Sequence, residues 1–308
     1  MANTSLTYAP SRAAPVGQHG MWWELKQNRA AYLLLAPFII YFLIVVAYPF
    51  FYSVYLSFFD ATLNRAPVFV GFGNFVRLAQ DPQFRHALGN TAFFTVFAVI
   101  GETILSLVVA FMMNEPLRGR LVLRTAFFLP VVTSWVIVSI MWSMLFSRAG
   151  LINGILHAMG LPIQPFLAST TQAMWVIIAL SVWKNMGYFM VIFLAGLQGV
   201  PVDLYEAASL DGANRLRQFW HVAIPALRPV IYFVVSISMI NAAQLFTQPF
   251  IMTNGGPLDS TLSVVQLLYR ASFVNLQFGY GSAMGTVLLV ILVVLSLVNR
   301  RVNDWITR

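Results

Sequence analysis

The chain has 308 residues, of which 59% are hydrophobic and 9% are charged. Soluble domains are about a quarter charged and less than half apolar, so this composition excludes an ordinary soluble globular protein. Disorder is excluded because 26 Phe and 8 Trp supply more apolar surface than a solvated coil carries. The lack of Cys removes disulfides, thiolate zinc sites and Cys nucleophiles. The sequence therefore predicts a membrane protein.

Six segments are long and apolar enough to cross a bilayer, which takes roughly 20 residues of helix. We predict an all-α polytopic membrane protein with six transmembrane helices, at about 31–57, 89–113, 125–146, 173–197, 229–252 and 279–299. Proline removes a backbone donor and disturbs the preceding turn of a helix. Kinks are therefore expected at the prolines inside these segments, which are Pro37, Pro49, Pro130 and Pro249.

The basic residues between the predicted spans set the orientation, because Lys and Arg favour cytoplasmic loops. Twelve lie on one side: Arg12, Lys26, Arg29, Arg118, Arg120, Arg124, Arg215, Arg217, Arg228, Arg300, Arg301 and Arg308. Five lie on the other: Arg65, Arg77, Arg85, Arg148 and Arg270. Both termini are therefore expected in the cytoplasm, and the net charge of +8 needs no nucleic acid to explain it. Residues 1–30 are expected to form a flexible cytoplasmic leader, and 31–308 the transmembrane domain.

The loop at 200–229 carries helix signals that a simple connector does not need. It reads VPVDLYEAASLDGANRLRQFWHVAIPALRP. Asp203 is a candidate N-cap with Glu206 as its capping-box partner, and Gly212 suits the left-handed residue that ends a helix. A second short helix is expected at 214–224. The pattern predicts a helix–turn–helix with a small-residue face, and by propensity alone an Ala-rich connecting loop remains an alternative.

The same loop resembles the EAA signature of permease subunits in ATP-binding-cassette (ABC) importers. The resemblance rests on EAA at 206–208, DGA at 211–213, Phe219, Ile224–Pro225 and Pro229. Other stretches similar to this family are GFGNF at 71–75, GLIN at 151–154, LAGLQGVP at 194–201 and TNGGP at 253–257. Together they cover roughly residues 31–300. TNGGP and the first outer loop look more like the F-type subunit of maltose-type sugar permeases than its G-type companion.

This resemblance implies partners and a mechanism. A second, G-type permease subunit would complete the pore as a heterodimer, two ATPase subunits would bind ATP and Mg²⁺, and an external solute-binding protein would deliver a di- or oligosaccharide. The EAA helix would be the cytoplasmic coupling helix that lies in a groove of the ATPase, through Glu206, Ala207, Ala208, Asp211, Gly212 and Ala213. The resemblance places the chain in a bacterial or archaeal inner membrane.

The chain itself is not expected to hydrolyse ATP. A P-loop needs a Lys directly after Gly, so that the ammonium reaches phosphates held by backbone amides. Leu25 precedes Lys26 and Trp183 precedes Lys184, and the chain has no other Lys. No cofactor or metal is therefore expected in this subunit.

Polar side chains within the predicted spans follow two helical faces. The fourth span carries Ser181, Lys184, Asn185 and Tyr188, and the fifth carries Ser238, Asn241, Gln244 and Gln248. Amides and hydroxyls both donate and accept, as a sugar path requires, although the same groups also make ordinary interhelical hydrogen bonds. Ser134, beside Trp135, is a further candidate for the path. Alignment on the EAA loop matches 181, 185, 188, 238, 241, 242 and 245 to sugar-contacting positions of the family, but Ala242 and Leu245 are apolar where the maltose permease has amides.

Glu102 and Lys184 are the two charged residues deep within predicted spans, at matching depth. An isolated charge is costly in lipid, so we predict that they form an ion pair or share one polar network. The alternative for Lys184 is contact with an anionic substrate such as a sugar phosphate.

The outer loops 58–88, 147–172 and 253–278 are expected to form a docking face for the binding protein, or to act as simple connectors, and 261–273 is expected to include a short interfacial helix.

An importer of polyols or glycerol phosphates is an alternative function within the same family. From other classes, a stand-alone secondary carrier and an intramembrane enzyme are weaker alternatives, because a proton relay needs more ionisable groups and the four His lie in loops.

Overall fold

The computed structural model describes residues 29–115 and 119–306 of the chain. The predicted leader, 1–30, lies almost wholly outside the described residues. The described chain divides into two units, with the boundary between Tyr52 and Ser53.

The first unit is one apolar helical stretch. It comprises α2 (Arg29–Tyr41), the π-helical segment η1 (Phe42–Ala47) and the start of α3 (Tyr48–Leu56). Pro37 lies inside α2. Its side chains are exposed along its length, with Leu34 at 82%. An apolar helix of 25 residues with no buried side chain is suited to face lipid, as expected for the first span.

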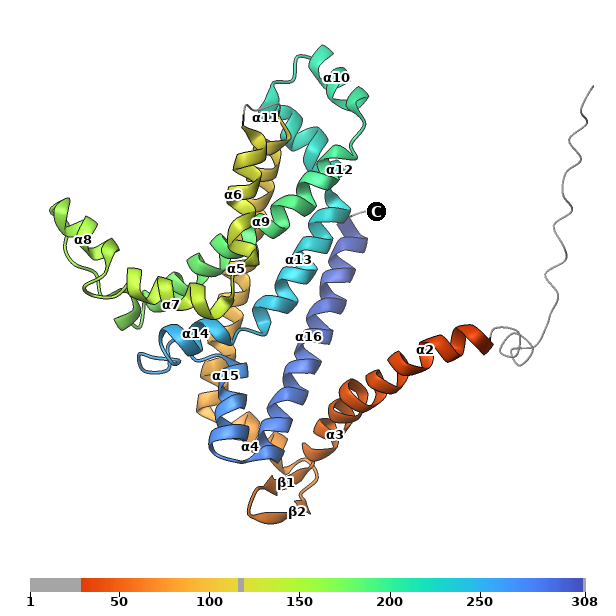
Figure 1. Ribbon diagram of the computed structural model, residues 1–308, viewed down its shortest axis with the longest axis vertical. Helices are drawn as coiled ribbons and strands as arrows, with labels where there is room; N and C mark the ends of the chain where they lie inside the picture. Colours follow the sequence, from red (N-terminus) through yellow and green to blue (C-terminus); the bar gives the residue numbers. More distant parts are fainter. Residues whose placement is uncertain (1–28, 116–118, 307–308) are drawn as a thin grey trace, which may run out of the picture. The chain divides into compact units, whose positions relative to one another are not determined.

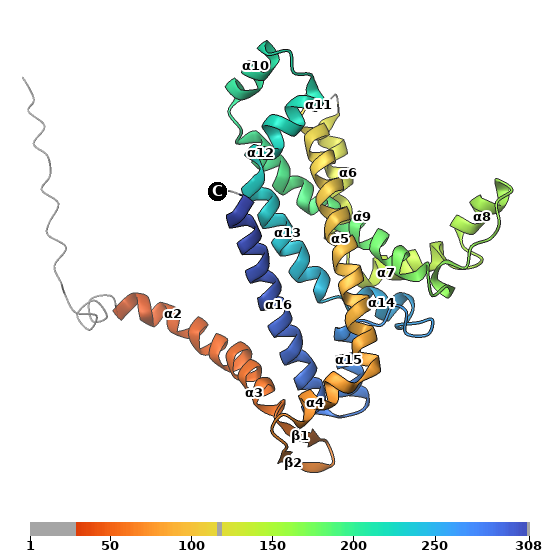
Figure 2. The same cartoon turned by 180° about the vertical axis from the view of Figure 1, so that it is seen from behind.

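The second unit contains the remaining elements, most of them helices. In chain order they are β1 (Phe59–Thr62), β2 (Arg65–Phe69), α4 (Gly73–Gln80), α5 (Pro82–Asn114), α6 (Arg120–Val132), α7 (Trp135–Leu145), α8 (Leu151–Ala158), η2 (Phe166–Ala168), α9 (Ala173–Gln198), α10 (Val202–Leu210), α11 (Arg215–Gln218), η3 (Phe219–Ala223), α12 (Ile224–Ala226), α13 (Arg228–Ala243), α14 (Thr247–Met252), α15 (Val264–Tyr269), η4 (Arg270–Val274) and α16 (Phe278–Ile306). Within this unit α13 lies between α16 and the α5–α9 pair (Figures 1 and 2).

Four of the six predicted spans coincide with long apolar helices. The third coincides with a bent pair, and the fifth coincides with the second helix of another bent pair together with α14. The long helices are Tyr32–Leu56, Pro82–Asn114, Ala173–Gln198 and Phe278–Val302. The bent pairs are Arg120–Val132 with Trp135–Leu145, at 100°, and Arg215–Ala226 with Arg228–Ala243, at 72°. The expectation of an all-helical membrane protein is confirmed, with up to six spans if each bent pair is counted once.

The third predicted span bends after Pro130 rather than at it. The helix continues through Pro130 to Val132, and Thr133 is extended. The break removes the donors that a continuous helix would supply to the carbonyls of the last turn. The Thr133 hydroxyl donates to the Pro130 carbonyl at 2.6 Å, and the Lys184 ammonium donates to the Val131 carbonyl at 3.1 Å.

The fifth predicted span, 229–252, is not one helix. α13 ends at Ala243, and α14 starts at Thr247 after a short break. Pro249 accounts for this break, because it has no N–H for the carbonyl of Leu245, four residues earlier. The Ser263 hydroxyl donates to that carbonyl instead, at 2.6 Å. The break therefore falls in the turn that precedes the proline.

A small hairpin precedes α5. Strands β1 and β2 pair antiparallel, with Phe59 opposite Phe69, which is a departure from an all-helical fold that the sequence did not predict. α5 then begins with Pro82 at its first position, where proline is tolerated, and the Asp81 carboxylate accepts the backbone N–H groups of Gln83 and Phe84. This cap fixes the start of the longest described helix, 33 residues, well before the predicted residue 89.

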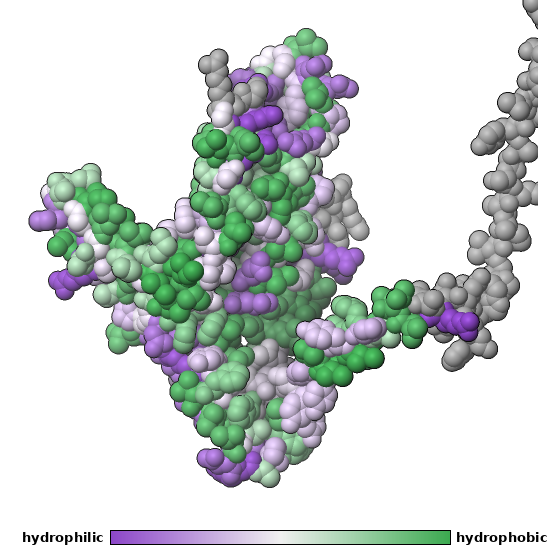
Figure 3. All heavy atoms as spheres, viewed as in Figure 1, coloured by the Kyte–Doolittle hydropathy of each residue, from purple (hydrophilic) through white to green (hydrophobic). Residues whose placement is uncertain are grey.

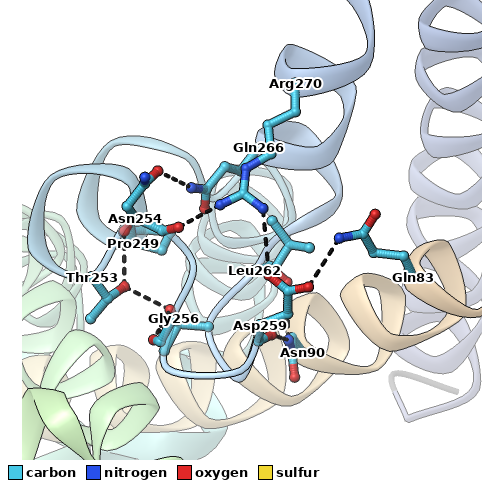
Figure 4. Close-up of polar contacts among 11 residues, drawn as sticks. Gln83, Asn90, Pro249, Thr253, Asn254, Gly256, Asp259, Leu262, Gln266 and Arg270 are labelled. Carbon is cyan, nitrogen blue, oxygen red and sulfur yellow. Dashed lines mark hydrogen bonds and ion pairs between the residues drawn. The ribbon is translucent and has the colours of Figure 1, made fainter. Parts of the chain in front are cut away.

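The segment after α14 folds back onto the start of α5 (Figure 4). The Asn90 amide donates to the carbonyls of Asp259 and Leu262, at 2.8 and 3.0 Å, and Gln83 donates to the Asp259 carboxylate at 3.0 Å. Arg270 donates to the same carboxylate and to the carbonyl of Asn254. The expected helix at 261–273 is present as α15 and η4, with Ser263 as the N-cap that accepts from Gln266.

The helices around α9 pack closely because glycines allow it. A Cβ at Gly187 would lie 2.0 Å from the carbonyl oxygen of Phe127 in α6, and a Cβ at Gly101 in α5 would lie 2.8 Å from Val182. Real Cβ atoms do not make contacts this short, so these glycines are needed at the crossings of α9 with α6 and α5. α9 is accordingly the central helix, with fifteen buried residues.

Gly187→Ala is expected to force α6 away from α9 and to destabilise the protein by about 1–3 kcal/mol, the usual range for overpacking. The thermal unfolding midpoint of the detergent-purified chain measures this. Gly89→Ala is the matched control, because a Cβ at Gly89 of α5 meets nothing within 4 Å. Equal midpoints for the two variants would contradict the assignment.

Candidate functional site

A polar cavity of about 330 Å³ lies where the two breaks meet the central helices. Its walls come from α5, α7, α9, the end of α13, the break and α14. They are formed by Phe94, Glu102, Trp135, Ser181, Asn185, Asn241, Ala242, Gln244, Leu245, Phe246, Thr247 and Gln248. The cavity thus combines three aromatic rings with hydroxyl, amide and carboxylate groups.

Glu102 is at the centre of the polar contacts of this cavity. It is 2% exposed and lies on α5, two turns after Phe94. Its Oε1 accepts from the Asn185 amide of α9 at 2.7 Å, and its Oε2 accepts from the Ser238 hydroxyl of α13. One carboxylate therefore joins three helices, and both of its oxygens have a donor, as a buried carboxylate requires.

The predicted ion pair between Glu102 and Lys184 is not formed in the described part of the chain. The Lys184 ammonium donates to the Val131 carbonyl and lies 4.6 Å from the centre of the Trp135 ring. Successive residues of a helix point about 100° apart, so Lys184 and Asn185 cannot both face α5. Asn185 faces Glu102, and Lys184 is directed to the bend between α6 and α7.

The broken segment 244–248 supplies the other polar wall. Asn241, Gln244 and Gln248 line the same cavity, as predicted for one path, but they do not share one helix. Gln248 approaches α9, where its amide lies 3.5 Å from the Ser181 hydroxyl. The break therefore turns Gln244 and Gln248 toward the cavity. These residues line one wall although they do not lie on one continuous helix.

Three predicted path residues are placed differently from the rest. Ser238 is fully buried behind Glu102, and Ser134 and Tyr188 do not line the cavity. Four lining residues were not predicted: Phe94, Trp135, Phe246 and Thr247. Phe94 could have been found from its spacing, because it lies eight residues before Glu102 and thus on the same helical face.

The loop at 200–229 forms α10, a glycine turn and α11, at the opposite end of the bundle from the hairpin (Figure 1). Pro201 rather than Asp203 is the N-cap of α10, so the predicted capping box is wrong. The helix starts two residues earlier than predicted, directly after the non-helical Pro201. Gly212 has φ +76°, and the Ala213 N–H bonds to the Ala208 carbonyl at 2.9 Å. This is the Schellman arrangement that glycine permits at the end of a helix.

Side-chain contacts hold α10 beside α11. Gln218, 5% exposed, donates to the Ser209 hydroxyl at 2.8 Å and to the Tyr205 carbonyl at 3.4 Å. Arg215 of α11 pairs with Glu115 at the end of α5, at 2.8 Å. Burial, with the Glu115 carboxylate nearby, raises the pKa of Tyr205.

The outer surface of this loop is exposed and partly apolar. Glu206 and Ala207 are exposed, and Leu210 is 90% exposed. Glu206, Leu210 and Ala213 border a groove of about 770 Å³ between α10 and α11. Figure 3 shows hydrophilic side chains around α10 and α11, and again at the opposite end of the bundle.

The described residues contain no group of three His, Asp or Glu side chains that could hold a metal ion. The polar groups of the cavity are neutral amides and hydroxyls with one carboxylate. Such a set can bind and orient a polyhydroxylated molecule, and it offers no paired acid and base for catalysis.

Lys184→Met is expected to lower stability by about 1–3 kcal/mol, because it leaves the Val131 carbonyl without a donor at the α6–α7 bend. The thermal unfolding midpoint in detergent measures this. Lys184→Arg keeps a donor and should retain most of the stability. A Lys184→Met protein as stable as the wild type would show that the carbonyl has another donor.

Comparison with known proteins identifies the family. Residues 102–308 match the family described as the inner membrane component of binding-protein-dependent transport systems. The arabinooligosaccharides transport system permease protein AraP of Bacillus subtilis (strain 168) is 34% identical over 298 residues, covering 96% of this chain and 94% of that protein. The trehalose/maltose transport system permease protein MalF of Thermococcus litoralis (strain ATCC 51850 / DSM 5473 / JCM 8560 / NS-C) is 30% identical, covering 92% and 96%.

A solved structure supports the fold. The crystal structure of a bacterial ABC transporter involved in the import of the acidic polysaccharide alginate contains a chain that matches with a TM-score of 0.82. The match has 24% identity and covers 94% of this chain and 99% of the other. The family match and the two relatives confirm the resemblance drawn from the EAA loop. The chain belongs to the inner membrane components of binding-protein-dependent transport systems: it is a multi-pass, non-catalytic permease subunit of an ABC importer.

Proposed function

We propose that this permease imports a carbohydrate, most simply a di- or oligosaccharide, and that the polar cavity is part of its path. The observation that carries the proposal is the cavity wall itself, in which four amide side chains and two hydroxyls lie beside Phe94, Trp135 and Phe246. Amides match the hydroxyls of a sugar, and aromatic rings pack on its apolar face. The names of AraP and MalF point to the same class of solute.

Two features of the structure narrow the range of solutes that the permease is proposed to import. Ala242 and Leu245 border the cavity where the maltose permease has amides, which argues against maltose itself. Lys184 is directed to the Val131 carbonyl, which removes the cation that a sugar phosphate or glycerol phosphate would use. Family membership also sets aside a stand-alone secondary carrier and an intramembrane enzyme.

The remaining parts of the complex follow from the same proposal. This chain forms half of the pore with a second, G-type permease subunit, the solute-binding protein docks on the outer loops, and two ATPase subunits bind ATP and Mg²⁺. The transmembrane domain is 31–308, with 1–30 as a cytoplasmic leader and both termini in the cytoplasm. Ser134 and Tyr188 belong to a wider part of the path, and Ser238 acts through Glu102.

Coupling to the ATPase is proposed for the loop at 200–229. Glu206 supplies an ionic contact, and Ala207 and Ala208 permit close docking. Asp211, Gly212 and Ala213 shape the turn. The exposed Leu210 and the groove beside it add an apolar surface of the kind that buried interfaces use. The Schellman turn and the Gln218 contacts hold this surface in one shape.

Deletion of the gene in the natural host tests the class of solute. Uptake is measured over a panel of neutral di- and oligosaccharides, polyols and glycerol phosphates. The deletion is expected to abolish uptake of a carbohydrate and to leave the other classes intact, with wild-type protein restoring it. Loss confined to polyols or glycerol phosphates would overturn the carbohydrate proposal.

Asn241→Leu is expected to lower that uptake by about tenfold or more, because an apolar side chain of similar size cannot replace the amide's hydrogen bonds. Radiolabelled uptake by the complemented strain measures the effect. Ile240→Leu, one residue away and absent from the cavity wall, is the matched control. Unchanged uptake with Asn241→Leu would exclude this wall from the path.

Glu206→Lys is expected to lower substrate-stimulated ATPase activity of the reconstituted complex by about tenfold or more, since it reverses the charge at the proposed contact. Gly212→Pro should act in the same direction, because proline cannot adopt φ +76°. Gln198→Lys introduces a lysine just outside the loop and should leave coupling intact. Wild-type activity with both Glu206→Lys and Gly212→Pro would refute the assignment.

A further inference from the structure

The charge of the polar cavity is set by one residue. Among the described residues that line it, Glu102 alone carries a formal charge, and the others are amides, hydroxyls, aromatic rings and aliphatic groups. Its two hydrogen-bond donors, Asn185 and Ser238, are neutral. They donate to both oxygens of the carboxylate and contribute no positive charge of their own.

No cation described in the structure neutralises this carboxylate. Two ion pairs seen within residues 29–115 and 119–306 are Arg215 with Glu115 and Arg270 with Asp259, and neither involves Glu102. Lys184 is the nearest basic residue along α9, but its ammonium lies over the Trp135 ring and bonds to a backbone carbonyl. Trp135, and not Lys184, forms the cavity wall.

We propose that Glu102 is a specificity-determining residue: it gives the cavity a negative potential that admits uncharged carbohydrates and rejects uronates and sugar phosphates of the same size. The assignment of a carbohydrate as the solute rests on the proposed function, whereas the negative potential rests on the position of Glu102 in the cavity wall. A like charge about 6 Å from the carboxylate, at an effective dielectric near 20, is disfavoured by about a hundredfold. Neutral sugars are not affected by this repulsion and can use the amide wall.

The potential of the cavity can be measured without knowing the solute, because the chain has no native Cys. Gln244→Cys places a single thiol on an exposed part of the cavity wall. Two methanethiosulfonates of similar size are compared on the assembled complex at pH 8, one bearing a trimethylammonium and the other a sulfonate. Mass spectrometry of this chain gives the two rates of disulfide formation, whatever thiols the partner subunits carry.

The ratio of cationic to anionic rates is expected to be about tenfold or more higher at Gln244→Cys than at Leu258→Cys, a control at an 89% exposed position of an outer loop. Adding Glu102→Gln should bring the ratio down to that of the control. Glu102→Asp keeps the charge and should keep most of the ratio. Lys184→Met should leave it unchanged or raise it.

A ratio at Gln244→Cys equal to that of the control would overturn the proposal, even if Glu102→Gln fails to assemble. Equal effects of Glu102→Gln and Glu102→Asp would also overturn it, because a structural change and not charge would then be responsible. Thr247→Cys is the second reporter, and lack of reaction with either reagent at both reporters would mean that no reachable charged cavity exists.

The proposed function has its own separate test. If the deletion strain loses uptake of a non-carbohydrate solute, the carbohydrate class fails while the measured potential of the cavity stands. If uptake of a neutral sugar is lost but the rate ratios show no effect of Glu102, the carbohydrate class stands and the role of Glu102 fails.

Discussion

Backbone carbonyls freed by broken helices are the constraint on which this structure depends. In a bilayer no water is available to satisfy them, so each break must be supplied with donors by the protein. The chain breaks two predicted spans, after Val132 and after Ala243. The carbonyls of Pro130, Val131 and Leu245 then accept from Thr133, Lys184 and Ser263. Lys184 and Ser263 come from distant parts of the chain, so the breaks also fix how the helices are assembled.

The cavity follows from these breaks. Trp135 is the first residue of α7 after one break, and the segment Gln244 to Gln248 spans the other. A continuous helix would turn its side chains through a full circle and bring few of them to one place. Irregular backbone at membrane depth is tolerated where it lines a cavity or is buried in protein. The breaks in the helices therefore bring the polar side chains to the cavity wall, and the cavity in turn accommodates the irregular backbone.

The long spans were predictable because hydrophobic length is a local property, and α9 agrees with its predicted range within one residue at its C-terminal end. The turn at Gly212 was predictable for the same reason. A kink near Pro130 was predicted, but its position at Thr133 was not, because the Val131 carbonyl beside it accepts from Lys184, 53 residues later in the chain. The partner of Glu102 was missed because matching depth does not distinguish Lys184 from Asn185, and only the rotation of α9 decides which of them faces α5. The hairpin at 59–69 was missed because its strands are only four and five residues long.

The route from the cavity to the loop at 200–229 runs along α5 and α9. Glu102 lies on α5 and Glu115 directly follows this helix, thirteen residues later. At 1.5 Å per residue this separation is about 20 Å. Glu102 joins α5 to α9 and α13 beside the cavity, and Glu115 joins α5 to Arg215 beside α10. The glycine crossings hold α9 tightly against α5 and α6, so the helices cannot slide independently. If an ATPase moves the loop, the displacement reaches Asn185 and Glu102 through packed helices, and the non-helical backbone between α13 and α14 is where the cavity can change shape.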